Sequence, residues 1–141
     1  MDIRPLTEDY AVSPQIAPED VAAIKAAGFT TVICNRPDAE NPAELQADAM
    51  RAAVEAAGLT FIVNPVVHGQ LTQKIVDAQG QVIAESTGPV LAYCASGNRS
   101  TVVWALSQAG SRPVDELIGI PARYGYQLEG LRSHLESLSE G

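Results

Sequence analysis

The sequence predicts an α/β fold: a single three-layer domain in which a largely parallel sheet is flanked by helices. Three observations support this prediction. Twice within the first 63 residues, a helix-forming segment ends at a glycine and leads directly into a short strand-like run. A third strand-like run, residues 89–93, is followed by another helix-forming segment. Such alternation is typical of parallel strands that are joined by helical crossovers.

The first repeat spans residues 18–34. Pro18 suits the first turn of a helix, and the two acidic residues after it suit the positive end of the helix dipole. Gly28 offers a left-handed C-terminal cap. The β-branched run over residues 29–34 is typical of a buried strand.

The second repeat spans residues 41–63. Asn41 is expected to cap a helix that has Pro42 in its first position and Glu44 in its third. Gly58 should end this helix, and a strand should follow it. The apolar side chains expected on one face of the helix are those of Leu45, Ala49, Ala52, Ala53 and Ala56.

The remaining elements are weaker repetitions of the same pattern. Gly80 lies inside the next expected helix, where glycine costs about 1 kcal/mol relative to alanine, and the expected apolar face holds Leu71, Ile75, Val82 and Ile83. Gly110 should end the helix after the third strand. The expected elements are helices over residues 71–85, 100–109, 114–118 and 128–138, and an edge strand over residues 10–13.

Composition excludes several classes of protein. With 141 residues, 46% of them hydrophobic, the chain has the length of one domain, and we expect residues 1–141 to form one. A net charge of −8 argues against a nucleic-acid partner.

Residues 1–20 carry neither the basic nor the apolar part of a signal peptide, and the chain holds no membrane-spanning run, so we expect a cytoplasmic protein. Two cysteines and two histidines do not make a usual zinc site, so we expect no metal and no cofactor.

Three loops should meet at one edge of the sheet. In open α/β sheets, ligands bind outside the carboxyl ends of the strands. The segments that follow the three predicted inner strands are residues 35–40, 65–69 and 94–99. The sequence therefore predicts that any chemistry is located there.

The third of these loops carries the strongest chemical signal. Cys94 lies between a buried strand and the start of a helix, where backbone N–H groups converge and favour a thiolate. Gly97 permits a positive φ or a close approach of backbone, and Arg99 can hold two oxygens of a tetrahedral anion. Ser100 could donate a hydrogen bond to the thiolate. The expected anion-binding loop comprises Ala95, Ser96, Gly97, Asn98, Arg99 and Ser100. The simpler interpretation of Cys94 alone is a buried structural cysteine.

This loop resembles those of known families. It is similar to the phosphate-binding loop of protein tyrosine and dual-specificity phosphatases, although those carry five residues between cysteine and arginine and this chain carries four. It also resembles the shorter active-site loop of rhodaneses. From about Tyr10 to Trp104, the chain is similar to the phosphatase-like domain of the beta-lactamase hydrolase-like proteins, a family also assigned to sulfur transferases. The matching motifs are SPQ at 13–15, PED at 18–20, AGF at 27–29, NRPD at 35–38, GPVLAYC at 88–94 and GNRS at 97–100.

The resemblance implies a protein tyrosine phosphatase-like fold and leaves three functions open. The first is a cysteine-dependent hydrolase that cleaves phosphomonoesters through a cysteinyl-phosphate. The second is a rhodanese-type transferase that carries a persulfide on Cys94. The third is an anion-binding module with little or no turnover. The expected partner is accordingly a small oxyanion, a phosphorylated substrate or a sulfane-sulfur donor, and the sequence leaves the oligomeric state open.

A phosphatase also needs an acid to protonate the leaving group. The loop that matches the acid-bearing loop of small dual-specificity phosphatases offers His68 and no carboxylate, and Asp38 on the neighbouring loop is the other candidate. Both have a simpler interpretation, as a loop histidine and a turn-forming aspartate. Asn35 and Arg36 could form the rim of the site, and Cys34 could act as a resolving partner of Cys94 or be a buried strand cysteine.

Overall fold

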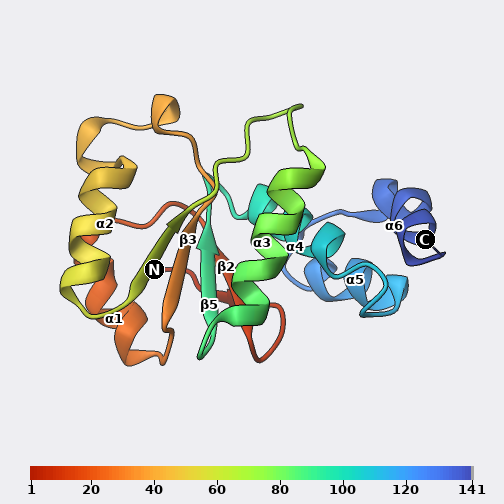
Figure 1. Cartoon of the computed structure of the whole chain (residues 1–141), viewed down its shortest axis with the longest axis horizontal. Helices are drawn as coiled ribbons and strands as arrows, with labels where there is room; N and C mark the ends of the chain where they lie inside the picture. The colour runs from red at the N-terminus through yellow and green to blue at the C-terminus, as the bar shows by residue number, and fades with distance from the viewer. Residues whose placement is uncertain (141) are drawn as a thin grey trace.

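The computed structural model describes residues 1–140 and contains a five-stranded sheet flanked by helices (Figure 1). The strand order is β1-β2-β5-β3-β4. Strands β2, β5, β3 and β4 run parallel, and β1 is antiparallel to β2. Their bounds are β1 Arg4–Pro5, β2 Tyr10–Ser13, β3 Thr31–Cys34, β4 Thr60–Val63 and β5 Val90–Tyr93. The predicted α/β class and the largely parallel sheet are confirmed.

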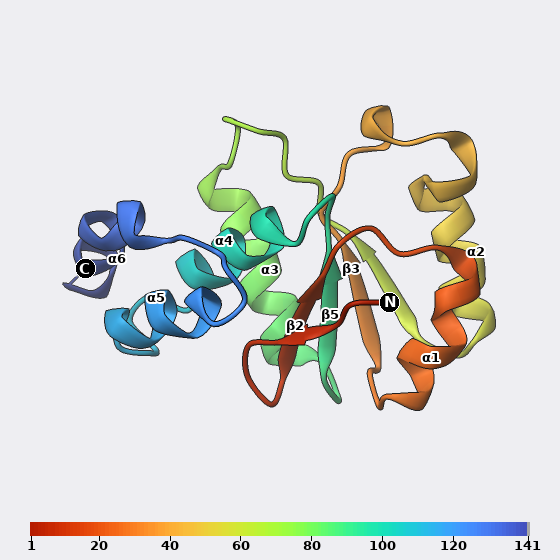
Figure 2. The ribbon, with the colours of Figure 1, turned by 180° about the vertical axis from the view of Figure 1, so that it is seen from behind.

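Helices cover both faces of the sheet. On one side lie α1 (Val21–Ala26) and α2 (Ala47–Ala56), and on the other lie α3 (Gln73–Glu85) and α4 (Asn98–Ser107), as the two opposite views agree (Figures 1 and 2). Beyond α4 follow α5 (Val114–Ala122) and α6 (Arg132–Glu140). Short 3-10 turns occupy Pro18–Asp20, Asp38–Glu40, Ala43–Leu45 and Glu129–Leu131.

The strands divide their side chains between two hydrophobic clusters. Ile33 and Ala92 belong to the cluster that includes Trp104 of α4, and the residues just before them, Val32 and Leu91, belong to the cluster beneath α1 and α2. Successive side chains of a strand point to opposite faces. Because both faces are covered, β2, β3 and β5 are buried along their whole length, which explains their nearly continuous apolar sequence.

The predicted position of the strand over residues 10–13 in the sheet is wrong. Residues 10–13 do form a strand, but β2 lies inside the sheet between β1 and β5 and not at its edge. The strand that covers it, β1, has only two residues, Arg4 and Pro5. Two residues are too few to give a periodic pattern, so the sequence showed no sign of it.

The start of α2 and its buried face also differ from the prediction. The helix begins at Ala47, after an extended Gln46, and not at Pro42. The Asn41 side chain donates to the Gln15 side chain at 3.0 Å and does not cap the helix. With this later start, the buried residues of the helix are Ala47, Met50 and Val54, whereas the predicted Ala52 and Ala56 are exposed.

Helix α3 packs on the sheet with the expected face, and Val76 and Gln79 lie on the same face; the helix begins at Gln73, so Leu71 precedes it. Its buried residues are Val76 and Gln79, while Ile75, Val82 and Ile83 are half-buried. A Cβ on Gly80 would lie 3.3 Å from Cβ of Ser107 in α4, so the glycine allows these two helices to approach closely. The glycine that weakened the helix prediction therefore has a packing role.

Candidate functional site

The three predicted loops meet at the carboxyl ends of the strands. Arg99, in the first turn of α4, donates from Nη1 to the carbonyl oxygen of Val66 at 2.8 Å, which joins the loop after β5 to the loop after β4. Its guanidinium also contacts the carboxylate of Glu40 on the loop after β3. The predicted segments therefore meet, as expected, at the edge of the sheet where ligands bind in open α/β folds.

The carbonyl groups of residues 95–97 are all held from outside the loop. The backbone N–H of Gln15 donates to the Ala95 carbonyl at 3.3 Å. The Tyr126 hydroxyl donates to the Ser96 carbonyl at 2.8 Å, and the Thr101 hydroxyl donates to the Gly97 carbonyl at 2.7 Å. In a trans peptide, the C=O of one residue and the N–H of the next point in opposite directions. Holding the carbonyls outward therefore turns the following N–H groups toward the inside of the loop.

One of these inward amides reaches the sulfur of Cys94. The N–H of Gly97 donates to Sγ of Cys94 at 3.1 Å. Among residues 1–140, the amides of Ala95 and Ser96 donate no hydrogen bond to a protein acceptor. Converging N–H groups at the start of a helix form an anion-binding arrangement, which stabilises a thiolate and could hold an oxyanion.

Gly97 is required in this loop for two reasons. Its φ is +93°, a conformation that side chains with a Cβ rarely adopt. In addition, a Cβ at this position would overlap the hydroxyl of Tyr126. Both expectations for Gly97, a positive φ and a close approach, are confirmed.

Cys94 itself is fully buried, whereas Ala95, Ser96 and Asn98 around it are exposed. The sulfur thus lies directly beneath the loop and close to the surface. Ionisable side chains on four segments interact electrostatically with it: Tyr10 of β2, Cys34 of β3, Arg99 of α4 and Tyr126 after α5.

Arg99 is buried and forms a forked ion pair with Glu40. Nη1 of Arg99 lies 2.9 Å from Oε2 of Glu40, and Nη2 lies 2.7 Å from Oε1. The hydrogen bond from Arg99 lowers the pKa of Glu40, and the same bond raises the pKa of Arg99. Glu40 is therefore a carboxylate at neutral pH and could not donate a proton to a leaving group.

The ion pair leaves one edge of the guanidinium available. Arginine carries five N–H donors in a plane. The bonds to Glu40 and Val66 use both protons on Nη1 and one on Nη2. The Nε–H and the second Nη2–H lie side by side on another edge, and no oxygen of residues 1–140 accepts from them. Such an edge matches two oxygens of a phosphate group.

Sequence reasoning identified the segment that contains Glu40 but not the residue itself. Glu40 follows the NRPD motif in an exposed loop and has no neighbouring residue that suggests a partner. Its partner Arg99 is 59 residues away in the sequence. The only usable signal was that both residues follow the carboxyl ends of adjacent parallel strands.

Two predicted site residues belong to a buried hydrogen-bond network beneath the loop. The hydroxyl of Ser100 donates to Oδ1 of Asn35 at 2.9 Å, so its partner is Asn35 and not the Cys94 thiolate that the sequence suggested. Asn35 is fully buried and so is not a rim residue. Its side-chain NH₂ donates to the Asn64 carbonyl at 2.8 Å and to Oε1 of Gln79 at 3.0 Å.

Gln79 of α3 is the centre of this network. Its Nε2 donates to Tyr10 at 3.0 Å and to Oδ1 of Asn35 at 3.1 Å, and its Oε1 accepts from Asn35 and from Asn64. Every polar position of the fully buried Gln79 amide is thus satisfied. The network fixes the ends of β3 and β4 relative to the start of α4, and so contributes to the position of Arg99.

The structure separates the two candidate acids. His68 is exposed and lines a cavity of ≈ 180 Å³ together with Arg99, Val66 and Leu71. Asp38 instead accepts the backbone N–H of Ala47 at 2.8 Å, so its carboxylate caps the start of α2. Of the two, only His68 lines a cavity together with Arg99.

Of the remaining candidates, Arg36 contacts Glu40 and Cys34 contacts Arg36. Arg36 contacts Oε1 of Glu40 at 3.2 Å and Oε1 of Gln15 at 3.3 Å, so it supports the ion pair rather than extending freely into solvent. Cys34 is buried and donates to the carbonyl of Arg36 at 3.3 Å. Burial raises the pKa of the Cys34 thiol, which disfavours a reactive thiolate. Both cysteines are free in this structure.

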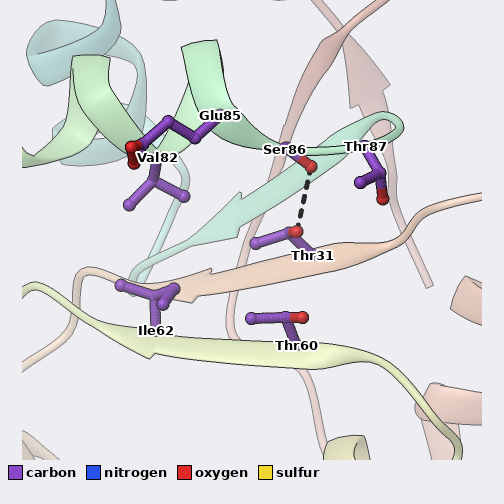
Figure 3. Close-up of a pocket in the computed structure, with 7 residues that line it drawn as sticks. All are labelled: Thr31, Thr60, Ile62, Val82, Glu85, Ser86 and Thr87. Atoms are coloured by element: carbon purple, nitrogen blue, oxygen red, sulfur yellow. Dashed lines mark hydrogen bonds between the residues drawn. The ribbon is translucent and has the colours of Figure 1, made fainter.

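A second cavity lies at the opposite end of the strands (Figure 3). It measures ≈ 220 Å³ and is lined by Thr31, Thr60, Ile62, Val82, Glu85, Ser86 and Thr87. The hydroxyls of Thr31 and Ser86 bond to each other at 3.0 Å, and Ser86 also donates to the Gly88 carbonyl. Because Thr31 and Thr60 begin their strands, this cavity is remote from Cys94 and is not part of the candidate site.

Two features are absent from residues 1–140. No group of three or more histidine, cysteine or acidic side chains is arranged to hold a metal ion. No helix in this range has both the length and the hydropathy of a bilayer-spanning segment.

Comparisons with known proteins concern the family and the fold of the chain. A family model described as "Beta-lactamase hydrolase-like protein, phosphatase-like domain" matches residues 2–111. A Beta-lactamase hydrolase-like protein from Xylella fastidiosa (strain Temecula1 / ATCC 700964) is 32% identical over 130 residues, which make up 91% of this chain and 30% of that protein. The chain therefore spans about a third of the length of the curated relatives it matches.

Solved structures extend the similarity to the fold. A crystal structure from Neisseria meningitidis Z2491, described as that of a candidate phosphatase, is 34% identical with a TM-score of 0.84, and covers 98% of this chain and 99% of its own. Tk-PTP in a glycine-to-alanine mutant form has a TM-score of 0.76 at 19% identity, and covers 99% and 95% of the two chains. At that identity the likeness shows the fold alone, and it confirms the protein tyrosine phosphatase-like architecture.

Proposed function

Since the chain belongs to the family of phosphatase-like domains of beta-lactamase hydrolase-like proteins, we propose that it is a cysteine-dependent phosphatase that cleaves phosphomonoesters, with Cys94 as its nucleophile. Family membership and fold establish a phosphatase-like protein. The finer assignment depends on one observation, the hydrogen bond of 3.1 Å from the Gly97 amide to the Cys94 sulfur in a loop whose amides converge.

The proposed reaction has two steps. The Cys94 thiolate attacks phosphorus and forms an S–P bond while the bond from phosphorus to the ester oxygen breaks, and the departing oxygen takes a proton from an acid. A water molecule then attacks the cysteinyl-phosphate and gives a proton to the acid of the first step, which is now a base. The S–P bond breaks, its electron pair returns to Cys94, and inorganic phosphate leaves.

Arg99 and the loop amides stabilise the charge that develops on the phosphoryl oxygens. The free Nε–H and Nη2–H edge of Arg99 suits two of these oxygens, and the amide of Ser96, which the held Ala95 carbonyl turns into the loop, suits another. Glu40 holds the opposite edge of the guanidinium in place, and the Val66 carbonyl fixes Nη1. In this proposal Glu40 is a positioning residue and does not contact the substrate.

The proposed acid is His68. It lines the same cavity as Arg99 and is exposed to solvent, and a histidine side chain can donate a proton to a departing oxygen. Asp38 is disfavoured in this role because its carboxylate accepts the N–H of Ala47, and Glu40 because its pKa is lowered.

A sulfur transferase is the second candidate, and the short loop favours it. Only four residues separate Cys94 from Arg99, and a terminal persulfide sulfur needs less room than a phosphoryl group. In this reaction the Cys94 thiolate takes the outer sulfur of thiosulfate and releases sulfite. Cyanide then takes the sulfur as thiocyanate and regenerates the thiolate. No acid comparable to His68 is needed.

A phosphate ester of an aromatic alcohol is the first substrate class to examine. P. aeruginosa TpbA, a protein of similar fold and 16% identity, was solved in complex with phosphotyrosine in a form that carries a cysteine-to-serine substitution. We therefore extend a phosphoaryl substrate to this chain as part of the proposal. The proposal does not include activities of the longer relatives that depend on segments this chain does not match.

The proposal is tested by supplying an aryl phosphate in one assay and thiosulfate with cyanide in another. We expect phosphate release that vanadate inhibits and that Cys94→Ser abolishes. Cys34→Ser is the matched control, because it removes the other buried cysteine and should leave turnover within about twofold of the unchanged protein. Thiocyanate formation without phosphate release would replace this proposal with the sulfur reaction. If neither product forms and phosphate still raises the unfolding temperature, the domain only binds anions.

A further inference from the structure

A continuous chain of hydrogen bonds leads from the N-terminal strand to the candidate nucleophile. Nη1 of Arg4 donates to the Tyr126 hydroxyl oxygen at 2.6 Å. That hydroxyl donates to the carbonyl of Ser96 at 2.8 Å. Across the same peptide group, the N–H of Gly97 donates to Sγ of Cys94 at 3.1 Å.

This chain has a direct electrostatic consequence for the sulfur. A hydrogen bond to a carbonyl oxygen polarises its peptide group, so the N–H on the other side becomes a stronger donor. The donation from Arg4 polarises the phenol in the same sense. Because the peptide is planar and trans, the Tyr126 bond also fixes the direction in which the Gly97 N–H points.

We propose that Tyr126 is a positioning residue for Cys94, whose hydroxyl orients and polarises the peptide group between Ser96 and Gly97 and thereby stabilises the thiolate. This inference rests on the proposed role of Cys94 as nucleophile, and it assigns to the segment after α5 a part in the chemistry of the loop. Arg4 acts in the same direction but indirectly, because its hydrogen bond polarises the Tyr126 hydroxyl.

The surroundings of Tyr126 suit this role. The side chain is largely buried, with 7% of its surface exposed, and burial raises the pKa of its hydroxyl, which therefore stays protonated and can donate at neutral pH. The guanidinium of Arg4 lies 5.4 Å from the centre of the Tyr126 ring, and Asp2 holds Arg4 from its other side. A backbone bond of 3.2 Å from Tyr126 to the Pro121 carbonyl anchors the residue to the end of α5.

Other ionisable groups also interact electrostatically with the sulfur, and the test must leave them unchanged. They are Arg99 from α4, Tyr10 from β2 and Cys34 from β3. All three remain in a Tyr126→Phe variant. A change in thiolate stability in that variant therefore reports the lost hydroxyl and not the other groups.

The chain supplies a closely matched control. Tyr124, two residues away, donates its hydroxyl to the Pro5 carbonyl at 2.7 Å and so also holds the N-terminal strand, but it makes no bond to the loop. Tyr124→Phe removes the same atom from the same region. Arg4→Met removes the donor to Tyr126 and keeps most of the apolar stem of the side chain.

The experiment measures the ultraviolet absorbance of the thiolate as a function of pH. For each protein, the absorbance of the same protein carrying Cys94→Ser is subtracted, so that the difference reports Cys94 alone. In Tyr126→Phe we expect the titration midpoint to move to higher pH by about half to one unit, the equivalent of one weakened hydrogen bond. Arg4→Met should give a smaller shift in the same direction, and Tyr124→Phe should give none. Thermal unfolding of each variant confirms that it is folded at the temperature used.

An unchanged midpoint in folded Tyr126→Phe, or an equal shift in Tyr124→Phe, would overturn the inference. The titration requires no turnover, so its outcome is separate from that of the proposed function. If the unchanged protein releases no phosphate but the midpoint shifts as expected, the positioning role stands and the phosphatase proposal fails.

Discussion

The Arg99 guanidinium and the Glu40 carboxylate are joined by two short hydrogen bonds, of 2.9 Å and 2.7 Å, between residues 59 positions apart in the sequence. The pair occupies one edge of the guanidinium and leaves another edge without an oxygen acceptor among residues 1–140, which suits the positioning role proposed for Glu40. It also partly neutralises the positive charge of Arg99. These two effects act differently on binding and on catalysis, so they can be separated by experiment.

Glu40→Gln is expected to lower kcat for an aryl phosphate by about tenfold to a hundredfold, because Arg99 is no longer held in place for the transition state. The affinity for inorganic phosphate should not weaken, because a competing negative charge is removed. Steady-state kinetics and phosphate inhibition constants measure the two effects. A parallel loss of kcat and of phosphate affinity would mean that Glu40 maintains the folded loop as a whole.

The same ion pair makes folding stability depend on pH. The pKa of Glu40 is lower in the folded chain than in the unfolded one, so its contribution to stability is present above the ordinary pKa of glutamate. That contribution is lost as the pH falls through the lowered folded-state pKa. In Glu40→Gln the urea-unfolding free energy should therefore decline less steeply below about pH 4.5. Glu44→Gln, which removes an exposed carboxylate that forms no ion pair within residues 1–140, is the control and should leave the slope unchanged. Curves with the same slope for Glu40→Gln and the unchanged protein would refute this assignment.

Gly97→Ala is expected to destabilise the protein far more than Gly28→Ala. Both glycines have a φ near +100°, which costs alanine about 1–2 kcal/mol. At Gly28 an added Cβ meets no atom within 4 Å, whereas at Gly97 it overlaps the Tyr126 hydroxyl, at a further cost of about 1–3 kcal/mol. Chemical denaturation of the two variants gives the comparison. Equal losses of unfolding free energy in the two variants would show that the Tyr126 hydroxyl moves away from the added Cβ without an energetic cost.

Gln79→Leu is expected to cost about 3 kcal/mol or more in unfolding free energy, because it leaves polar groups of Asn35, Asn64 and Tyr10 buried without their partner. Gln81→Leu, on the exposed side of the same helix, should change stability by less than about 0.5 kcal/mol. Urea denaturation of both variants measures this. If Gln79→Leu were as stable as Gln81→Leu, the network would not hold the strand ends together.

His68→Gln is expected to slow hydrolysis of alkyl phosphates much more than hydrolysis of aryl phosphates with strongly acidic leaving groups. A general acid matters most when the departing oxygen is basic, and its loss typically costs about a hundredfold or more in that case. Turnover numbers for a series of esters measure the dependence. The same reduction for every ester would count against His68 as the acid.

The local features of the site could be predicted from the sequence, because their signal lies within a few residues. The strand, the glycine with positive φ and the arginine at the start of α4 all occur within residues 90–99. Parallel strand order then placed the loops after β3 and β4 beside this segment.

The features that the sequence did not reveal depend on contacts between distant residues. Glu40 and Tyr126 carry no local motif, and each acts through a partner on another element. The start of α2 was misplaced because its N–H at Ala47 is capped by Asp38, nine residues earlier, and not by the well-placed Asn41. Ser100 was expected to contact the sulfur because it lies near Cys94 in the sequence, but a helical turn directs its hydroxyl to Asn35.

The most direct test of the account is to trap the phosphorylated nucleophile. The protein is mixed with an excess of an aryl phosphate, quenched within the first turnover, and digested for mass spectrometry of the peptide that contains Cys94. The account predicts a phosphoryl group on Cys94 in the unchanged protein and in Cys34→Ser, and none in Cys94→Ser. Phosphate release with the phosphoryl group on another residue, or with Cys94→Ser still active, would contradict it.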